Sequence, residues 1–252
     1  MKGKWQATLA AVLTVASVVV SPVLAAPPSG SRDLAQIRTQ LVFEYVRFGN
    51  LKSALESAEQ AVRADDTFVP GLLAKAYVHA LLSQDAEAVR IYQRALQLEP
   101  DNPEGNNNYG LYLCEHGRPQ EALQYFARAL ANPLYNAPQT AHLNMGTCYI
   151  KLGRAEEANS ALLAALQAAP NYPPALRALA RLHSTQDNPK LAAFYFERLV
   201  QALPEGLGAD DLLLGVNIAR RTGDAARLAD WANQLKTRYP DSRETQQLIS
   251  GN

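Results

Sequence analysis

One repeat unit runs through most of this chain, and it constrains the possible fold more than any single motif does. A frame of 34 residues fits the sequence six times, with successive copies 34 or 36 residues apart. The frames begin at Ala35, Val69, Pro103, Gln139, Pro173 and Ala209. Self-similarity at a period of roughly 20 to 50 residues is typical of repeat architectures. We therefore expect an array of stacked repeats.

Several positions of the frame carry the same kind of side chain in nearly every copy. Position 8 holds Val42, Ala76, Gly110, Gly146, Ala180 and Val216, and position 20 holds Ala54, Ala88, Ala122, Ala158, Ala192 and Leu228. Position 24 holds Ala58, Tyr92, Phe126, Leu162, Phe196 and Ala232, and position 27 holds Ala61, Ala95, Ala129, Ala165, Leu199 and Leu235. The spacings of four and three keep one face of a second helix apolar. Small residues at positions 8 and 20 allow that helix to approach the first one closely.

Helix ends are also marked in each frame. Position 15 holds Gly49, Ser83, Gly117, Gly153, Asp187 and Gly223. Glycine adopts a left-handed backbone at little cost, and serine or aspartate can hydrogen-bond locally, so this position predicts the turn between two helices. Prolines at position 32 or one residue before it predict the end of the second helix: Pro100, Pro133, Pro170, Pro204 and Pro240.

This pattern resembles the tetratricopeptide repeat (TPR) family over residues 35–240. The resemblance implies an all-α fold, a right-handed superhelical solenoid of six TPR repeats. Abundant alanine and leucine, with few β-branched residues after position 25, favour helix in the same way. We assign 35–252 to the TPR domain and expect 241–252 to complete or cap the last helix, because a terminal repeat needs a polar outer side.

The first 25 residues predict a secretory signal peptide. Lys2 and Lys4 precede an apolar run over 7–20, and small residues lead to a cleavage site after Ala25. The alternative is a leader that stays attached as a membrane anchor, although its apolar run is short for a bilayer about 30 Å thick. Residues 26–34, rich in proline, glycine and serine, are expected to form a flexible spacer.

The charged residues and histidines argue against nucleic-acid binding and against catalysis. Basic and acidic residues balance at 24 each, so no polyanionic partner is indicated. The histidines fall in four different frames, where stacking keeps them from meeting at one metal ion: His79, His116, His142 and His183. Serine-hydrolase, zinc-protease and phosphate-loop motifs are missing from the sequence. We predict no enzyme activity, no cofactor, no metal site and no small-molecule substrate.

Four arginines give frames five and six a basic character: Arg177, Arg181, Arg220 and Arg221. They could meet an acidic segment of a partner protein. Charged side chains of this kind more often form a solvated face.

Four short motifs narrow the choice among TPR proteins. They are Asn-Asn-Asn-Tyr-Gly at 106–110, Leu-Cys-Glu at 113–115, Asn-Pro-Leu-Tyr at 132–135 and Leu-Leu-Leu-Gly at 212–215. Together they resemble the type IV pilus biogenesis and stability proteins. The resemblance implies six TPR units in the periplasm at the inner face of the outer membrane. It also implies a pilotin-like role in assembling the outer-membrane secretin, or in stabilising pili, and hence in twitching motility.

One feature departs from that family. Its members usually carry a lipid-modified cysteine at the leader junction, whereas residues 25–27 here are Ala-Ala-Pro. We therefore expect a periplasmic protein whose membrane association is indirect, with the secretin or other type IV pilus components as protein partners. The alternatives are a general periplasmic TPR adaptor for envelope or polysaccharide export and, from another class, a hydrolase or chaperone subunit with hidden chemistry.

The family resemblance implies that the first helices line a concave inner face. In frames one to four this predicts a continuous apolar groove with a polar anchor, formed by Phe43, Val46, Leu73, Tyr77, Leu81, Asn107, Leu111 and Leu143. Open apolar surface of this width suits an extended or helical peptide. The alternative is that residues 26–34 fold back and cover the groove.

The two cysteines, Cys114 and Cys148, are predicted to form a disulfide between frames three and four. Their frame positions, 12 and 10, differ in height by only about 3 Å along a helix. Helices pack about 8 to 10 Å apart whereas a disulfide needs Cα atoms within about 7 Å, so the bridge requires close backbones, which Gly110 and Gly146 would allow. An exported protein meets an oxidising compartment. The alternative is a pair of buried free thiols.

Overall fold

The computed structural model describes residues 29–203 and 206–251. These residues form helices connected by short turns, with no strand among them, and about 80% of them are helical. The prediction of an all-α fold is confirmed. The helices are α1 (Ser29–Arg47), α2 (Leu51–Ala64), α3 (Val69–Leu81), α4 (Asp85–Leu98), α5 (Pro103–Glu115), α6 (Pro119–Ala131), α7 (Pro138–Lys151), α8 (Ala155–Ala168), α9 (Pro173–Thr185), α10 (Pro189–Ala202), α11 (Ala209–Thr222), α12 (Ala225–Arg238) and α13 (Arg243–Ser250).

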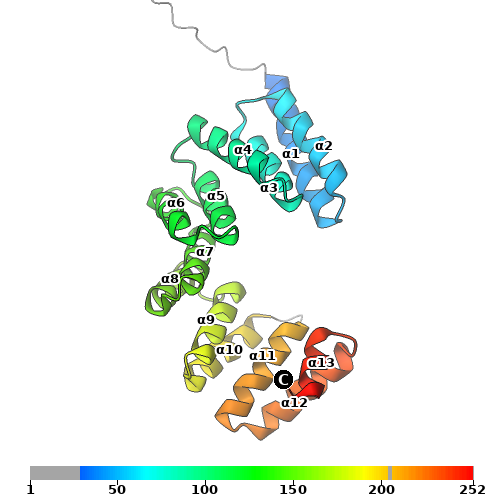
Figure 1. Ribbon diagram of the computed structural model, residues 1–252, viewed down its shortest axis with the longest axis vertical. Helices are drawn as coiled ribbons and strands as arrows, with labels where there is room; N and C mark the ends of the chain where they lie inside the picture. The colour runs from blue at the N-terminus through cyan, green and yellow to red at the C-terminus, as the bar shows by residue number, and fades with distance from the viewer. Residues whose placement is uncertain (1–28, 204–205, 252) are drawn as a thin grey trace, which may run out of the picture.

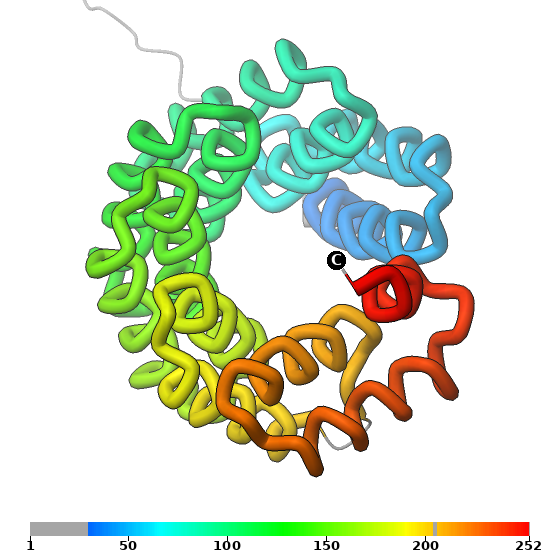
Figure 2. The backbone as a smooth tube through the Cα atoms, turned by 60° about the horizontal axis from the view of Figure 1, so that its bottom comes forward, coloured from blue at the N-terminus to red at the C-terminus, as the bar shows by residue number. Residues whose placement is uncertain are grey.

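The first twelve helices form six antiparallel pairs, one for each predicted frame. Each pair packs mainly on itself and on the next pair, which gives the stepwise path of Figure 1. Viewed closer to its axis, the chain curves around a centre, with the first helix of each pair on the inside and the second on the outside (Figure 2). The structure is therefore a TPR solenoid whose inner face is built from α1, α3, α5, α7, α9 and α11.

The turn inside each pair has the backbone conformation that the sequence predicts. All six residues at position 15 have positive φ, from 56° at Ser83 to 78° at Gly117. Asp187 is the other residue that is not glycine, with φ of 57°. These left-handed residues end the first helix and redirect the chain within two or three residues, so every pair is a tight hairpin.

The small residues allow the two helices of a pair to approach as predicted. All six residues at position 27 are fully buried, as are the five alanines at position 20. An added Cβ at Gly110 would lie 2.9 Å from the Phe126 ring, and one at Gly146 would lie 2.8 Å from Leu162. In each case the large side chain belongs to the second helix of the same repeat and occupies the space that glycine leaves.

The last repeat departs from the predicted register by one residue. Its close approach is made by Gly215 and not by Val216, because a Cβ at Gly215 would lie 2.7 Å from Phe196 and 2.9 Å from Trp231. Trp231 is buried, whereas Ala232, the predicted packing residue, is only half-buried. The bulky indole fills the space that an aromatic at position 24 fills in earlier repeats.

The amino-terminal end differs from the sequence-based expectation. The flexible spacer is wrong for residues 29–34, because α1 begins at Ser29 and runs through them. Contacts with the connection between α2 and α3 hold this extra length, since the Arg32 guanidinium lies 5.4 Å from the Phe68 ring and 3.9 Å from the buried Asp65 carboxylate. At the other end, α13 is a separate helix that packs on α11 and α12, so it caps the array and does not continue α12.

The signal peptide prediction for residues 1–25 lies outside the described residues, as do positions 26–28 and Pro204. Within the described part, Pro100, Pro133, Pro170 and Pro240 each follow the end of a second helix by two residues, as expected. No helix in that part combines the length and the apolarity that a membrane crossing requires.

Candidate functional site

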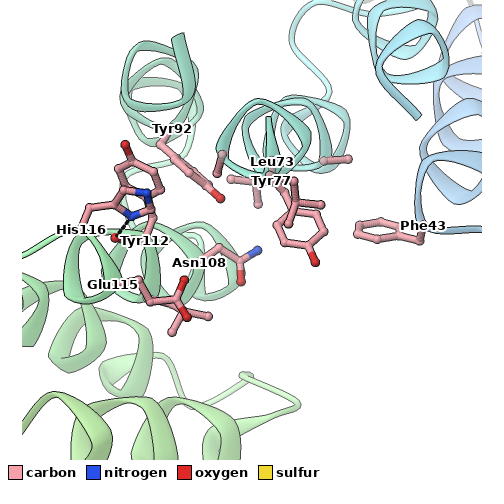
Figure 3. Close-up of a pocket in the computed structure, with 12 residues that line it drawn as sticks. Phe43, Leu73, Tyr77, Tyr92, Asn108, Tyr112, Glu115 and His116 are labelled. Carbon is pink, nitrogen blue, oxygen red and sulfur yellow. Dashed lines mark hydrogen bonds between the residues drawn. The ribbon is translucent and has the colours of Figure 1, made fainter. Parts of the chain in front are cut away.

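The first three repeats form a pocket on the inner face, which we call the inner pocket. Its volume is about 360 Å³, and it lies where α1, α3, α4 and α5 meet (Figure 3). Its lining residues are Phe43, Leu73, Ala74, Tyr77, Ala80, Leu81, Tyr92, Asn108, Leu111, Tyr112, Glu115 and His116. Most of them are apolar or aromatic, which is the usual lining of a site that binds a side chain or a small apolar group.

One side of the inner pocket presents two exposed aromatic rings. Phe43 from α1 is 52% exposed and Tyr77 from α3 is 39% exposed, and their ring centroids lie 6.5 Å apart. Figure 3 shows both rings directed toward the same open space. Large aromatic side chains left exposed together on an inner face are available to pack against another molecule.

The opposite side of the inner pocket is an aromatic wall, which is buried at Tyr92 and Tyr112 and exposed at His116. The Tyr112 ring lies 5.6 Å from Tyr92 and 4.0 Å from the imidazole of His116. Its hydroxyl lies 3.2 Å from Asp85 Oδ1, to which it can donate, and His116 Nε2 lies 3.3 Å from the same oxygen. Burial, aided by the hydrogen bond to Asp85, raises the pKa of Tyr112 to about 12. The hydroxyl therefore keeps its proton at neutral pH and can donate it to Asp85.

Two polar side chains, Asn108 and Glu115, lie along the edge of the inner pocket (Figure 3). Asn108 Oδ1 accepts a hydrogen bond from Asn107 Nδ2 at 3.3 Å, and Asn107 Oδ1 accepts one from Asn144 Nδ2 at 3.0 Å. The chain of amides leaves the Asn108 N–H groups for a molecule in the pocket. Glu115 is exposed and forms no ion pair within the described residues, so the edge offers both donors and a negative charge.

Comparison with known proteins identifies the repeat and then the family. Models of the tetratricopeptide repeat match residues 41–103, 91–124 and 113–182. The crystal structure of PilW, described as a widely conserved type IV pilus biogenesis factor, is 36% identical with a TM-score of 0.78. The alignment covers 86% of this chain and 98% of PilW. The chain belongs to the type IV pilus biogenesis family of TPR proteins.

PilF of Pseudomonas aeruginosa, a type IV pilus assembly protein, is a second member of this pilus TPR family. Its sequence is 27% identical over 209 residues, which is 83% of this chain and 82% of PilF. Its structure aligns with a TM-score of 0.75 at 26% identity, covering 88% of this chain and all of that chain. The similarity spans the whole array and not one repeat, as the four sequence motifs led us to expect.

Five of the eight predicted groove residues line the inner pocket of this pilus TPR protein: Phe43, Leu73, Tyr77, Leu81 and Leu111. The other three lie elsewhere. Val46 packs against the core around Val42, and Leu143 lines a separate pocket further along the inner face. The predicted groove residues thus line two pockets on the inner face, and a continuous groove across both stays a prediction.

Asn107, the predicted polar anchor, is buried at 6% exposure and is occupied by its hydrogen bonds with Asn144 and Asn108. Asn108 takes its place at the pocket edge, one residue further along α5. Three consecutive asparagines could not be distinguished from their types and spacing alone. The aromatic wall of Tyr92, Tyr112 and His116 was not predicted, because it forms where position 24 of the second repeat meets the end of the first helix of the third repeat.

Residues 29–34 are not among those that line the inner pocket, since they extend α1. The alternative in which this segment folds back over the groove is therefore wrong for these six residues.

Cys114 and Cys148 are joined by a disulfide between α5 and α7, with their Cα atoms 5.9 Å apart. The glycines do not provide this approach, because Gly110 and Gly146 face the second helices of their own repeats, Phe126 and Leu162 respectively. The bridge lies next to Glu115, at the end of the inner pocket. Oxidation of these thiols in the cell stays a prediction.

Three of the four basic residues of frames five and six form ion pairs with aspartates and stay partly exposed, whereas Arg220 is exposed and forms no ion pair within the described residues. Arg177 Nε and Nη2 donate to the two oxygens of Asp211 at 2.6 and 2.7 Å, and Arg181 Nη2 donates to Asp210 at 2.7 Å. Arg221 bonds to Asp187 in the same way. These pairs join successive repeats, which the sequence did not reveal because the partners are 29 and 34 residues apart. Within the described residues, no three histidine, cysteine or acidic side chains gather as a metal site.

Proposed function

We propose that this chain is a non-catalytic scaffold of type IV pilus biogenesis that acts in the periplasm at the inner face of the outer membrane. It binds a pilus-machinery protein through the inner pocket and assists assembly of the secretin or stabilises pili. Membership of the pilus TPR family supports the role in type IV pilus biogenesis. The open pair of aromatic rings, Phe43 and Tyr77, is the observation that supports the place and the mode of binding.

The chemistry of the inner pocket favours an apolar side chain of an extended or helical partner segment. Phe43 and Tyr77 can hold such a side chain between them, and the Tyr112 wall provides a fixed opposite surface. Asn108 supplies donors for a backbone carbonyl of the segment, and Glu115 favours a basic residue beside it. A few buried aromatic contacts at the centre of an interface provide most of its binding energy.

Complementation of a gene deletion tests this proposal. The wild-type gene should restore twitching motility, surface pili and secretin multimers, whereas Tyr77→Glu or Leu111→Glu should not, because each places a charge in the inner pocket. In a pull-down with the secretin, each variant should bind at least about tenfold more weakly, the loss expected for a central anchor. Circular dichroism should show unchanged helix content.

Ile249→Glu is the matched control. Ile249 is an apolar residue, 72% exposed, on α13 and outside the inner pocket, so this variant should complement fully. Normal motility with either pocket variant would show that the partner binds to another surface. Normal pili in the deletion strain itself would favour the alternative, an adaptor for envelope or polysaccharide export.

A further inference from the structure

A second pocket lies on the inner face between α7 and α9, and we call it the arginine pocket. Its volume is about 350 Å³. Leu143, Thr147 and Ile150 line it from α7, and Pro174, Ala178 and Leu182 line it from α9. Ile150 is 41% exposed, so this apolar floor is accessible. It is large enough for one bulky side chain, but unlike the inner pocket it has no aromatic ring in its lining.

Arg177, Arg181 and Thr185 from α9 complete the lining of the arginine pocket. Asp211, whose side chain is 3% exposed, holds Arg177 through two hydrogen bonds, and the arginine itself remains 29% exposed. The hydrogen bonds with Asp211 raise the pKa of Arg177 above its usual value, so the guanidinium is permanently charged. A two-point attachment to a buried carboxylate fixes the plane of the guanidinium at the pocket.

Arg181 is held more loosely, since it and Asp210 are 49% and 54% exposed and share one hydrogen bond. A guanidinium carries five N–H donors. Arg177 Nη1 and Arg181 Nε and Nη1 have no hydrogen-bond partner within the described residues, which leaves donors beside an apolar floor. An exposed ion pair contributes little to stability, so a second carboxylate can share the Arg181 guanidinium with Asp210 at little cost.

We propose that the arginine pocket binds an acidic side chain of a partner protein's segment, with a neighbouring apolar side chain of that segment on the floor. Charge complementarity supports an aspartate or glutamate, because both charged groups that line the pocket are arginines. The proposal extends the proposed function, since it rests on the inner face as the surface that binds a protein. It adds a specificity that the inner pocket lacks, where the charged group at the edge is Glu115.

Selection from a library of random twelve-residue peptides displayed on phage tests the proposal. The target is the full-length chain carrying Tyr77→Glu, which disables the inner pocket, so the outcome does not depend on the proposed function. Selected peptides should share an acidic residue next to an apolar one. The same selection on Tyr77→Glu/Arg181→Glu should lose that preference or replace the acid with lysine or arginine. Arg181 is an exposed surface residue, so the second substitution should leave the fold intact, which circular dichroism checks.

Binding measurements on a selected peptide show how much the acidic residue and Arg181 contribute to its affinity. Changing its acidic residue to the amide should weaken binding about tenfold, and Arg181→Glu should weaken it at least as much. Arg63→Glu on the outer helix α2, where Arg63 forms a similarly exposed pair with Glu59, should have no effect. Peptides without an acidic preference, peptides identical for both targets, or failure to select any binder would each overturn the proposal.

Discussion

The inner face of the first three repeats and that of the fifth repeat use the same frame positions for opposite chemistry. Positions 5 and 9 hold Leu73 and Tyr77 in the second repeat, but Arg177 and Arg181 in the fifth. The first pair lines an apolar pocket and the second lines a pocket with fixed positive charge. Meanwhile position 27 is fully buried in all six repeats. Fold and recognition are therefore carried by different positions of one repeat, and each can change without the other.

The two regions also differ in what joins neighbouring repeats. Around the inner pocket the joints are aromatic, with Tyr92 5.4 Å from Tyr109 and 5.6 Å from Tyr112 between ring centroids. Around the arginine pocket they are ionic, through Arg177 with Asp211 and Arg181 with Asp210. Apolar joints are insensitive to salt, whereas exposed ion pairs are screened by it. The second region should thus be the more sensitive to salt and to pH.

The disulfide lies at the boundary between the two regions, and its loss should have the largest effect on stability. Replacing Cys114 and Cys148 with alanine should lower the free energy of unfolding by about 3 to 4 kcal/mol, because the unfolded chain regains the freedom of a loop closed over some 35 residues. Urea unfolding of the oxidised protein and of the variant measures the difference.

Two further measurements separate this effect from a packing defect. Reduction of the wild type should reproduce the loss, and reduction of the double alanine variant should change nothing. Mass spectrometry of unreduced protein taken from the cell should find no thiol that can be alkylated. Two reactive thiols in that sample would contradict the disulfide, and equal stability of both forms would contradict its role at the boundary.

Breaking the ionic joints should have an intermediate effect on the free energy of unfolding, which a matched pair of variants measures. Asp211→Asn should cost about 2 kcal/mol, less than the 3 to 5 typical of a fully buried pair because Arg177 is partly exposed. Asp210→Asn removes the exposed partner of Arg181 and should cost less than about 1 kcal/mol. Urea unfolding at low and high salt measures both. Equal losses in the two variants would show that burial of Asp211 does not distinguish the joints.

Much of the fold could be predicted from the sequence because its determinants are local or periodic. The left-handed residue at position 15 serves the same purpose in all six copies, and the alanine at position 20 does so in five, so each copy supports the same prediction. The last repeat departs from the pattern because the rings of Trp231 and Phe196 fill the space beside Gly215, and Phe196 belongs to the preceding repeat. Such a compensation depends on three residues at once, which no single frame position reveals.

The candidate site was only partly predictable, for a related physical reason. The inner-face positions identified Phe43, Tyr77 and Leu111 because they depend only on helix geometry. Asn107 was wrong because the choice between it and Asn108 depends on a hydrogen bond from Asn144, in the next repeat. The pairing of Arg177 with Asp211 likewise needs the three-dimensional offset between repeats, and the sequence shows the residue types without their partners.

The smallest expected effect is a loss of stability in mild acid, which should arise in part from His183 on α9. His183 is 7% exposed, its Nε2 lies 3.1 Å from Asn159 Oδ1, and its Nδ1 is buried without a partner. Burial lowers the pKa of His183 below the usual 6.5, because a charged ring would lose its water. At a pH between the two pKa values the unfolded chain binds a proton that the folded chain does not, so stability falls as the pH drops below about 6.5 toward the folded-state pKa.

Thermal unfolding of the wild type at pH 7.5 and 5.5 should show this decrease, and His183→Gln, which cannot gain a charge, should show a smaller one. His142, whose pKa burial also lowers, accounts for a further part, so the His142→Gln/His183→Gln protein should be the least sensitive of the three. An undiminished decrease in that double variant would assign the acid sensitivity to other groups and remove this distinction between the two regions.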